Sequence, residues 1–221
     1  MINVQADFQT RAEEVERYFR FLRAFDDKQV SFTPPAGGPP PFTATEQSAL
    51  FKTLKANGFL LLYNLVESTS KNAIEAIYEE FRAEGVSFDV CRAEVRKIIL
   101  ENLKEHSVDK ILPSLSKLSV DVVVSTFQKD TVFAGNVDAR YLRKVAKSYG
   151  FQHPKKKSDE LLTVKSNRND LAHGTKSFAD VGRDYDLDRL ERIMKEVVGF
   201  LEELLKNIAS YLTSKRYLAV P

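Results

Sequence analysis

Apolar residues recur every three or four positions along most of this chain, and this spacing restricts the possible folds more than any other feature. The clearest example is the segment from about 186 to 213, whose repeating apolar positions are Leu187, Leu190, Met194, Val197, Leu201, Leu204 and Ile208. Such spacing places apolar side chains on one face of an α-helix, whereas a half-buried strand alternates apolar and polar residues. Only residues 120–127 have a strand-like, β-branched character, and we expect a helix there too because a lone strand has no partner. The sequence predicts an all-α protein.

The same spacing predicts further helices before this last one. They cover about residues 6–26, 44–81, 88–105, 108–118 and 139–149. Thr43 and Glu46 have the spacing of a capping box at the start of the second of these helices. Asn136 or Asp138 is placed to cap the fifth. Gly58 is a candidate position for a bend, because glycine weakens a helix interior.

We expect a single all-helical domain over residues 1–221. The proline-rich loop 31–42 is the longest irregular stretch, since proline lacks a backbone donor, but it is too short to separate two domains. A content of 43% hydrophobic and 29% charged residues is ordinary for a soluble globular protein. No apolar run approaches the roughly 18 residues of a membrane span, and the first residues lack the features of a secretory signal. A cytoplasmic protein without membrane contact is therefore expected.

Residues that bind metals are sparse in this sequence. Cys91 is the only cysteine, and the three histidines, His106, His153 and His173, are scattered along the chain. One cysteine forms neither an internal disulfide nor a cysteine zinc site, and the histidine spacing matches no metal motif. We expect no metal and no cofactor.

The predicted helix over about residues 159–173 carries most of the chain's plausible chemistry. Ser158 is a candidate N-cap with acidic residues after it, and Gly174 is a candidate helix stop. His173 then lies in the last turn, where the helix dipole favours an imidazolium.

Arg168 projects from the middle of the apolar face of this helix. That face is formed by Leu161, Val164, Leu171 and Ala172. A buried, unpaired cation costs several kcal/mol, so we expect the guanidinium to be paired, to reach a wet cavity or to lie at a subunit interface.

Positive charge is concentrated in the same third of the chain. Residues 140–183 contain 11 Lys and Arg against 4 Asp and Glu, a local charge of +7 in a chain whose net charge is +2. Such clustering favours a polyanion such as nucleic acid. A solvated lysine-rich loop is an equally good interpretation of Lys155, Lys156 and Lys157 taken alone.

Arg168 and His173 are separated by four residues in the run R-N-D-L-A-H-G, and Asn169 directly follows the arginine. This run resembles the R-x(4–6)-H signature of the HEPN superfamily. Residues 57–69 and 135–140 also resemble segments of one prokaryotic HEPN-like nuclease family. The resemblance implies an up-and-down helical bundle with additional N-terminal helices, dimeric through the motif helix.

The residue types suit the cleavage of RNA by its own 2′-hydroxyl. An imidazole changes its protonation state close to neutral pH, so it can move the proton of the 2′-hydroxyl. A guanidinium is always charged and grips phosphate oxygens in pairs. By resemblance, Arg168 polarises the scissile phosphate, His173 moves the proton and Asn169 orients the site. No metal is needed for this chemistry, and the product ends in a 2′,3′-cyclic phosphate.

The resemblance also implies partners. Arg168 and His173 lie about 140° apart around one helix, so a second copy is an attractive way to bring both groups to one phosphate. Further contacts to RNA are expected from Lys155, Lys156, Lys157, Lys165 and Lys176. A toxin or antiphage defence role is implied, with a cognate antitoxin or defence-system protein as a further partner.

Two other interpretations remain open at this point. In one, the chain is a non-catalytic HEPN module whose motif residues only contact RNA, a nucleotide or a partner protein. In the other, it is a structural helical adaptor in which Arg168 is held in a salt bridge and His173 merely caps a helix. Loss of RNA cleavage in motif variants would distinguish the enzyme from both.

Overall fold

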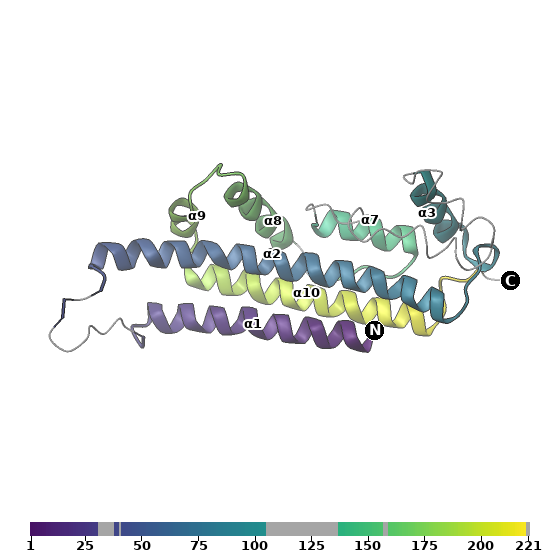
Figure 1. The fold of residues 1–221 in the computed structure, drawn as a ribbon, viewed down its shortest axis with the longest axis horizontal. Coiled ribbons are helices and arrows are strands. Elements are labelled where there is room, and N and C mark those ends of the chain that lie inside the picture. Colours follow the sequence, from purple (N-terminus) through teal and green to yellow (C-terminus); the bar gives the residue numbers. More distant parts are fainter. Residues whose placement is uncertain (31–37, 40, 105–136, 157–158, 220–221) are drawn as a thin grey trace. The chain divides into compact units, whose positions relative to one another are not determined.

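The computed structural model describes residues 1–30, 38–39, 41–104, 137–156 and 159–219. Their elements are α1 (Ile2–Asp26), α2 (Ala44–Ala83), η1 (Phe88–Val90), α3 (Ala93–Lys104), α7 (Ala139–Tyr149), α8 (Asp159–Ala172), α9 (Phe178–Asp184) and α10 (Leu187–Thr213) (Figure 1). Within these ranges all regular secondary structure is helical apart from one isolated β-bridge, so the prediction of an all-α fold is confirmed. The predictions for 108–118 and 120–127, and Asn136 as a cap, lie outside the described residues.

The chain folds into two compact units. The motif unit consists of Asp7–Val66 and Lys157–Gly199. The pocket unit consists of Met1–Ala6, Glu67–Lys156 and Phe200–Pro221. Helices α1, α2 and α10 supply residues to both. The expectation of a single domain over the whole chain stays a prediction.

In the motif unit, α1 packs along α2 and α10 through the apolar faces that their sequences predict. The phenol of Tyr18 donates to the carbonyl oxygen of Leu54 at 2.6 Å, which ties α1 to α2. Arg23 of α1 bonds the carboxylates of Asp188 and Glu191 at 2.5 and 2.9 Å, which ties α1 to α10. These three helices form the scaffold that carries α8 and α9.

Helix α2 begins and continues as its sequence indicates. The hydroxyl of Thr43 and the carboxylate of Glu46 form the predicted capping box, in which the Thr43 N–H donates to Glu46 Oε2 at 2.7 Å. This bond and one from the Thr43 hydroxyl hold the pKa of Glu46 below its ordinary value. Gly58 does not interrupt the helix: the Phe19 ring lies against it, 3.2 Å from where a Cβ atom would be.

In the pocket unit, α7 matches its predicted bounds. The Asp138 carboxylate caps it by accepting from the Tyr141 N–H at 2.8 Å, and Gly150 ends it in the left-handed conformation. Three buried tyrosines then join α2, α7 and α10. The Tyr78 and Tyr149 hydroxyls are 2.9 Å apart, and the Tyr211 hydroxyl donates to the Tyr149 carbonyl at 2.8 Å.

The prediction of one helix over 88–105 is wrong at its start. The chain forms the short η1 turn and then extended backbone before α3 begins at Ala93. Cys91 pairs with Leu218 in the isolated β-bridge, and the Arg92 N–H donates to the Tyr217 carbonyl at 2.9 Å. Val90, the last residue of η1, is 43% exposed. The segment after α10 therefore binds backbone groups that would otherwise form helical hydrogen bonds. No local sequence pattern predicts this contact between distant parts of the chain.

The short helix α9 is an element that the sequence pattern did not predict. The Ser177 side chain caps it by accepting from the Asp180 N–H at 3.1 Å. Gly182 lets α9 approach α2 so closely that a Cβ atom there would lie 1.9 Å from the Lys52 carbonyl oxygen. Among the described helices, none combines the length and the apolar character that crossing a bilayer requires.

Candidate functional site

Helix α8 carries the motif and covers Asp159–Ala172, close to the predicted range. Its buried residues are Glu160, Leu161, Val164, Asn167 and Leu171. Ala172, predicted on the apolar face, is exposed. The prediction that Ala172 lies on the buried face is wrong, because α8 ends at this residue and its side chain faces solvent. Asn167 takes a buried position instead, and the candidate cap Ser158 lies outside the described residues.

The end of α8 is a Schellman motif that fixes the backbone at His173. Gly174 adopts a left-handed conformation with φ of 68°, as predicted for the helix stop. Its N–H donates to the Leu171 carbonyl at 3.3 Å, and the Thr175 N–H donates to the Asp170 carbonyl at 2.9 Å. His173 is thereby held as the residue between the last helical residue and the glycine.

The His173 imidazole is open to solvent at this end of the helix. The residue is exposed, and within the described part of the chain its ring makes no hydrogen bond or ion pair. Its backbone N–H donates to the Asn169 carbonyl at 2.9 Å. The side chain is therefore free to meet a ligand or a second molecule.

Arg168 is half-buried and lies on an aromatic ring. Its guanidinium carbon is 4.3 Å from the centroid of Tyr63, a residue of α2 that is 3% exposed. Its Nη1 donates to Asn169 Oδ1 at 3.0 Å. Among the described residues no carboxylate forms an ion pair with it. A ring face and an amide hold the guanidinium in place without neutralising its charge.

Asn167 anchors α8 from the buried side of the helix. Its Nδ2 donates to the Thr163 carbonyl and to the Tyr185 hydroxyl, both at 2.9 Å. The Tyr185 ring in turn packs edge-on against Phe59 of α2, with centroids 4.8 Å apart. These groups set the rotation of α8 that brings Arg168 over Tyr63. Sequence reasoning missed them, although an asparagine at an apolar position of a helix is a detectable signal.

The predicted catalytic residues are brought together in part. Arg168 and Asn169 are joined by their side chains, whereas His173 is joined to Asn169 through the backbone alone. Over the described ranges of a single chain, no hydrogen bond links the imidazole to the guanidinium. The arrangement is an oriented guanidinium on α8 and, just beyond the last residue of that helix, an exposed imidazole.

The predicted RNA-binding lysines differ in their surroundings. Lys176 is 3.6 Å from Asp170, so part of its charge is balanced locally. Lys165 is half-buried on α8.

Lys155 and Lys156 belong to the pocket unit, where their backbone N–H groups both donate to the Glu203 carboxylate at 3.0 Å. The bond from Lys155 is the main reason why the pKa of Glu203 is lowered. The Lys156 ammonium also lies 3.7 Å from Glu202. Lys157 lies outside the described residues. The RNA contacts of these lysines stay a prediction.

Metal ligands do not gather anywhere in the described ranges. No group of three or more His, Cys, Asp or Glu side chains there is close enough to hold a metal ion. Cys91 is buried, and burial raises the pKa of its thiol to about 11, so it stays protonated at neutral pH.

A comparison with protein families places the whole helical chain in one group. A family model described as MAE_28990-like HEPN matches residues 2–217, a range that includes all of the described helices. A search of curated proteins and a search of solved structures found no match.

Proposed function

This chain belongs to the MAE_28990-like HEPN family, and we propose that it is a metal-independent endoribonuclease acting through Arg168, Asn169 and His173. At the level of the superfamily, membership indicates a nuclease or another RNA-related function. The single observation that carries the finer proposal is the state of Arg168. Its guanidinium is held by Tyr63 and Asn169 yet has no acidic partner among the described residues.

The chemistry follows from the two charged groups. The His173 imidazole takes the proton from a ribose 2′-hydroxyl, and the 2′-oxygen forms a bond to the adjacent phosphorus. The bond from phosphorus to the 5′-oxygen breaks, and the departing 5′-oxygen takes up a proton from solvent. Arg168 stabilises the negative charge on the non-bridging oxygens, which is greatest in the transition state. The products are a 2′,3′-cyclic phosphate and a 5′-hydroxyl.

We propose that a second copy of the chain completes the site. Arg168 and His173 lie about 140° apart around α8, which separates their side chains on one helix. Two α8 helices placed face to face would bring the guanidinium of one copy close to the imidazole of the other. The exposed Leu162 on α8, 45% accessible, supplies apolar surface for such a contact. A toxin or antiphage defence role, restrained by a cognate partner, is the corresponding biological proposal.

The test is RNA cleavage in the presence of EDTA. Wild-type protein should release fragments that end in 2′,3′-cyclic phosphate. Arg168→Ala and His173→Ala should each lower the cleavage rate by about 10²–10⁴-fold, the usual worth of acid–base or charge-stabilising groups. Arg183→Ala and His153→Ala are matched controls, since both residues are exposed and lie outside the motif. Intact RNA with wild-type protein would sink the proposal.

A second outcome would favour a non-catalytic RNA-binding module. In that case wild-type protein binds RNA without cutting it, and Arg168→Ala weakens binding and lowers its dependence on salt. The unneutralised guanidinium is compatible with this role too, because phosphate binding needs no imidazole. Gel analysis of the products separates the two functions directly.

A further inference from the structure

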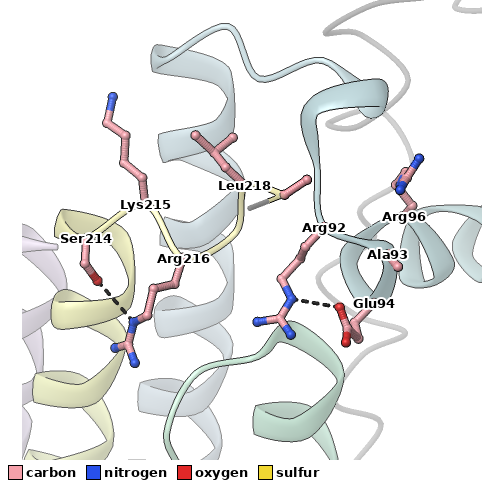
Figure 2. Close-up of a pocket in the computed structure, with 9 residues that line it drawn as sticks. Arg92, Ala93, Glu94, Arg96, Ser214, Lys215, Arg216 and Leu218 are labelled. Atoms are coloured by element: carbon pink, nitrogen blue, oxygen red, sulfur yellow. Dashed lines mark hydrogen bonds and ion pairs between the residues drawn. The ribbon is translucent and has the colours of Figure 1, made fainter. Parts of the chain in front are cut away.

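A basic pocket lies in the pocket unit, where the segment before α3 meets the segment after α10 (Figure 2). It has a volume of about 690 Å³. Its lining residues are Arg92, Ala93, Glu94, Arg96, Ser214, Lys215, Arg216, Leu218 and Ala219. Four of these are cationic and one is acidic. A pocket with this imbalance attracts anions.

Two of the four cations are already paired with acids. Arg92 Nε lies 2.8 Å from Glu94 Oε2, and this contact is the main reason why the pKa of Glu94 falls to about 2. Lys215 is paired with Glu84, which is not part of the pocket lining. Its side chain extends away from that of Arg216 in Figure 2. After these two pairs, the positive charges of the pocket that are not paired with an acid in the described part of the chain are those of Arg96 and Arg216.

Arg216 and Arg96 have no ion pair among the described residues. Arg216 is exposed, and its Nε and Nη2 donate to the hydroxyls of Ser214 and Ser210 at 3.1 and 3.4 Å. Arg96 is half-buried and lies near enough to Asp89 to help lower the pKa of that carboxyl, whose main hydrogen bond comes from Ser87. Arg216 is therefore the most available cation of the pocket.

The backbone holds the two walls of the pocket together. The Arg92 N–H donates to the Tyr217 carbonyl and the Ala219 N–H donates to the Val90 carbonyl, both at 2.9 Å. Arg92 is also fixed from below, because its guanidinium covers Gly150 so closely that a Cβ atom there would lie 2.1 Å from Nη1. In Figure 2 the guanidinium groups of Arg92 and Arg216 extend in the same direction from the two walls. Arg92 is thus positioned by packing before any ligand binds.

The turn that presents Arg216 has an unfavourable backbone conformation. Lys215 has a φ of 49°, a left-handed conformation that is usually left to glycine. The Lys215 and Arg216 N–H groups satisfy the last carbonyls of α10, those of Leu212 and Tyr211, at 3.0 and 3.2 Å. A lysine takes this place, where a glycine would fit more easily, and its ammonium is paired with Glu84.

We infer that this pocket binds the phosphate group of a nucleotide, with Arg216 as its main ligand and Arg92 and Arg96 as supporting charges. Guanidinium groups bind phosphate oxygens in pairs, and the apolar Ala93, Leu218 and Ala219 offer a surface for a base or a ribose. The volume is sufficient for one nucleotide, either free or as a unit of an RNA strand. This site does not depend on the proposed cleavage reaction.

The experiment compares two double variants of the full-length protein. Arg96→Gln with Arg216→Gln removes the two cations that lack an acidic partner. Arg17→Gln with Lys97→Gln removes the same charge from exposed positions outside the pocket, with side chains 56% and 78% accessible. Thermal melting checks that both variants are folded. The probes are adenosine 5′-monophosphate, adenosine, and a ten-residue 2′-O-methyl RNA that resists cleavage.

Wild-type protein should bind at least one phosphate-bearing probe more tightly than adenosine. The pocket variant should lose about tenfold or more in affinity for that probe, as expected when charge-assisted hydrogen bonds are removed, and the control variant should not. Loss of mononucleotide binding identifies a free nucleotide as a ligand, whereas loss confined to the oligomer identifies the RNA backbone. In the second case the slope of log K against log salt concentration becomes less steep by roughly 0.7 for each lost phosphate contact. The inference would be overturned if the pocket variant and the control variant bound the phosphate-bearing probes with equal affinity. It would also be overturned if wild-type protein bound adenosine as tightly as those probes.

Discussion

At the scale of single residues, the motif depends on how Arg168 is supported. Its guanidinium lies over the buried ring of Tyr63 and is bonded by Asn169, so its orientation is set without a carboxylate. A carboxylate in that position would bind the same guanidinium N–H groups that a phosphate needs. The ring therefore fixes the orientation of the guanidinium while the guanidinium keeps its charge.

Replacing Tyr63 tests this support. Tyr63→Leu should lower the single-turnover rate of RNA cleavage by roughly 2- to 30-fold, since a cation–π contact contributes about 0.5–2 kcal/mol. Tyr63→Phe keeps the ring face and should remain close to wild type. The rates are compared per folded protein, because Tyr63→Leu also alters the core. Equal rates for the two variants would show that the ring does not position Arg168.

At the scale of elements, α8 and α9 are set on α2 by a few specific contacts. Lys55 of α2 donates to the carbonyl of Tyr185 at 2.6 Å, and Asn167 of α8 donates to the hydroxyl of the same tyrosine. Tyr185 therefore links three helices in the turn before α10. The rotation of α8, and with it the position of Arg168, follows from this junction.

The close approach of α9 to α2 leads to a prediction about Gly182. Gly182→Ala should lower the free energy of unfolding by about 1–3 kcal/mol, the usual cost of inserting an atom into a filled space. The reason is that the new Cβ atom would meet the Lys52 backbone, which cannot rotate away. Urea denaturation measures the change.

Gly174→Ala provides the comparison for this prediction. Nothing lies within 4 Å of a Cβ atom at Gly174, so its expected cost of about 1–2 kcal/mol comes from the left-handed backbone alone. Helix content near His173 should change in Gly174→Ala but not in Gly182→Ala. A Gly182→Ala protein as stable as wild type would mean that α9 is not held against α2.

At the scale of the whole molecule, charge counted along the sequence differs from charge available in space. Residues 140–183 carry a local charge of +7, but some of these cations face acids that are distant in sequence. The backbone of Lys155 and Lys156 bonds Glu203, and the Lys156 ammonium lies near Glu202. The basic pocket, by contrast, gathers cations from residues 92–96 and 214–219, which no local count reveals.

The proposed composite site leads to a prediction about mixed dimers. A heterodimer of one Arg168→Ala chain and one His173→Ala chain, purified by two different tags, should recover roughly half of the wild-type cleavage rate. One of its two sites then receives an intact arginine from one copy and an intact histidine from the other. Each variant alone should be inactive.

The same experiment includes the opposite outcome. If both groups act within a single chain, neither chain of the heterodimer holds a complete pair, and the mixed dimer should be as inactive as its parents. Mass measurement in solution shows whether a dimer forms at all. A monomer that cleaves RNA would contradict the two-copy site while leaving the nuclease proposal in place.

Local features of this protein could be derived from its sequence. The helical period, the Thr43 capping box, the Asp138 cap and the glycine at 174 each depend on residues within one or two turns of each other. Such interactions are present in the sequence pattern itself, so the helices and the position of the motif followed from it. The resemblance to HEPN proteins rested on the R-N-D-L-A-H-G run and on residues 57–69 and 135–140, and it agrees with the family match.

Only the tertiary structure decided what surrounds these elements. The break between η1 and α3 arises because Tyr217 and Leu218 take the backbone groups at Arg92 and Cys91. The Tyr63 ring beneath Arg168 and the Tyr185 hydroxyl at Asn167 likewise join distant parts of the chain. Sequence alone determined most of the helices and the motif, because their causes are local, but it missed α9 and the break before α3. Packing determined which partners the motif side chains meet, because those contacts depend on how separate helices fit together.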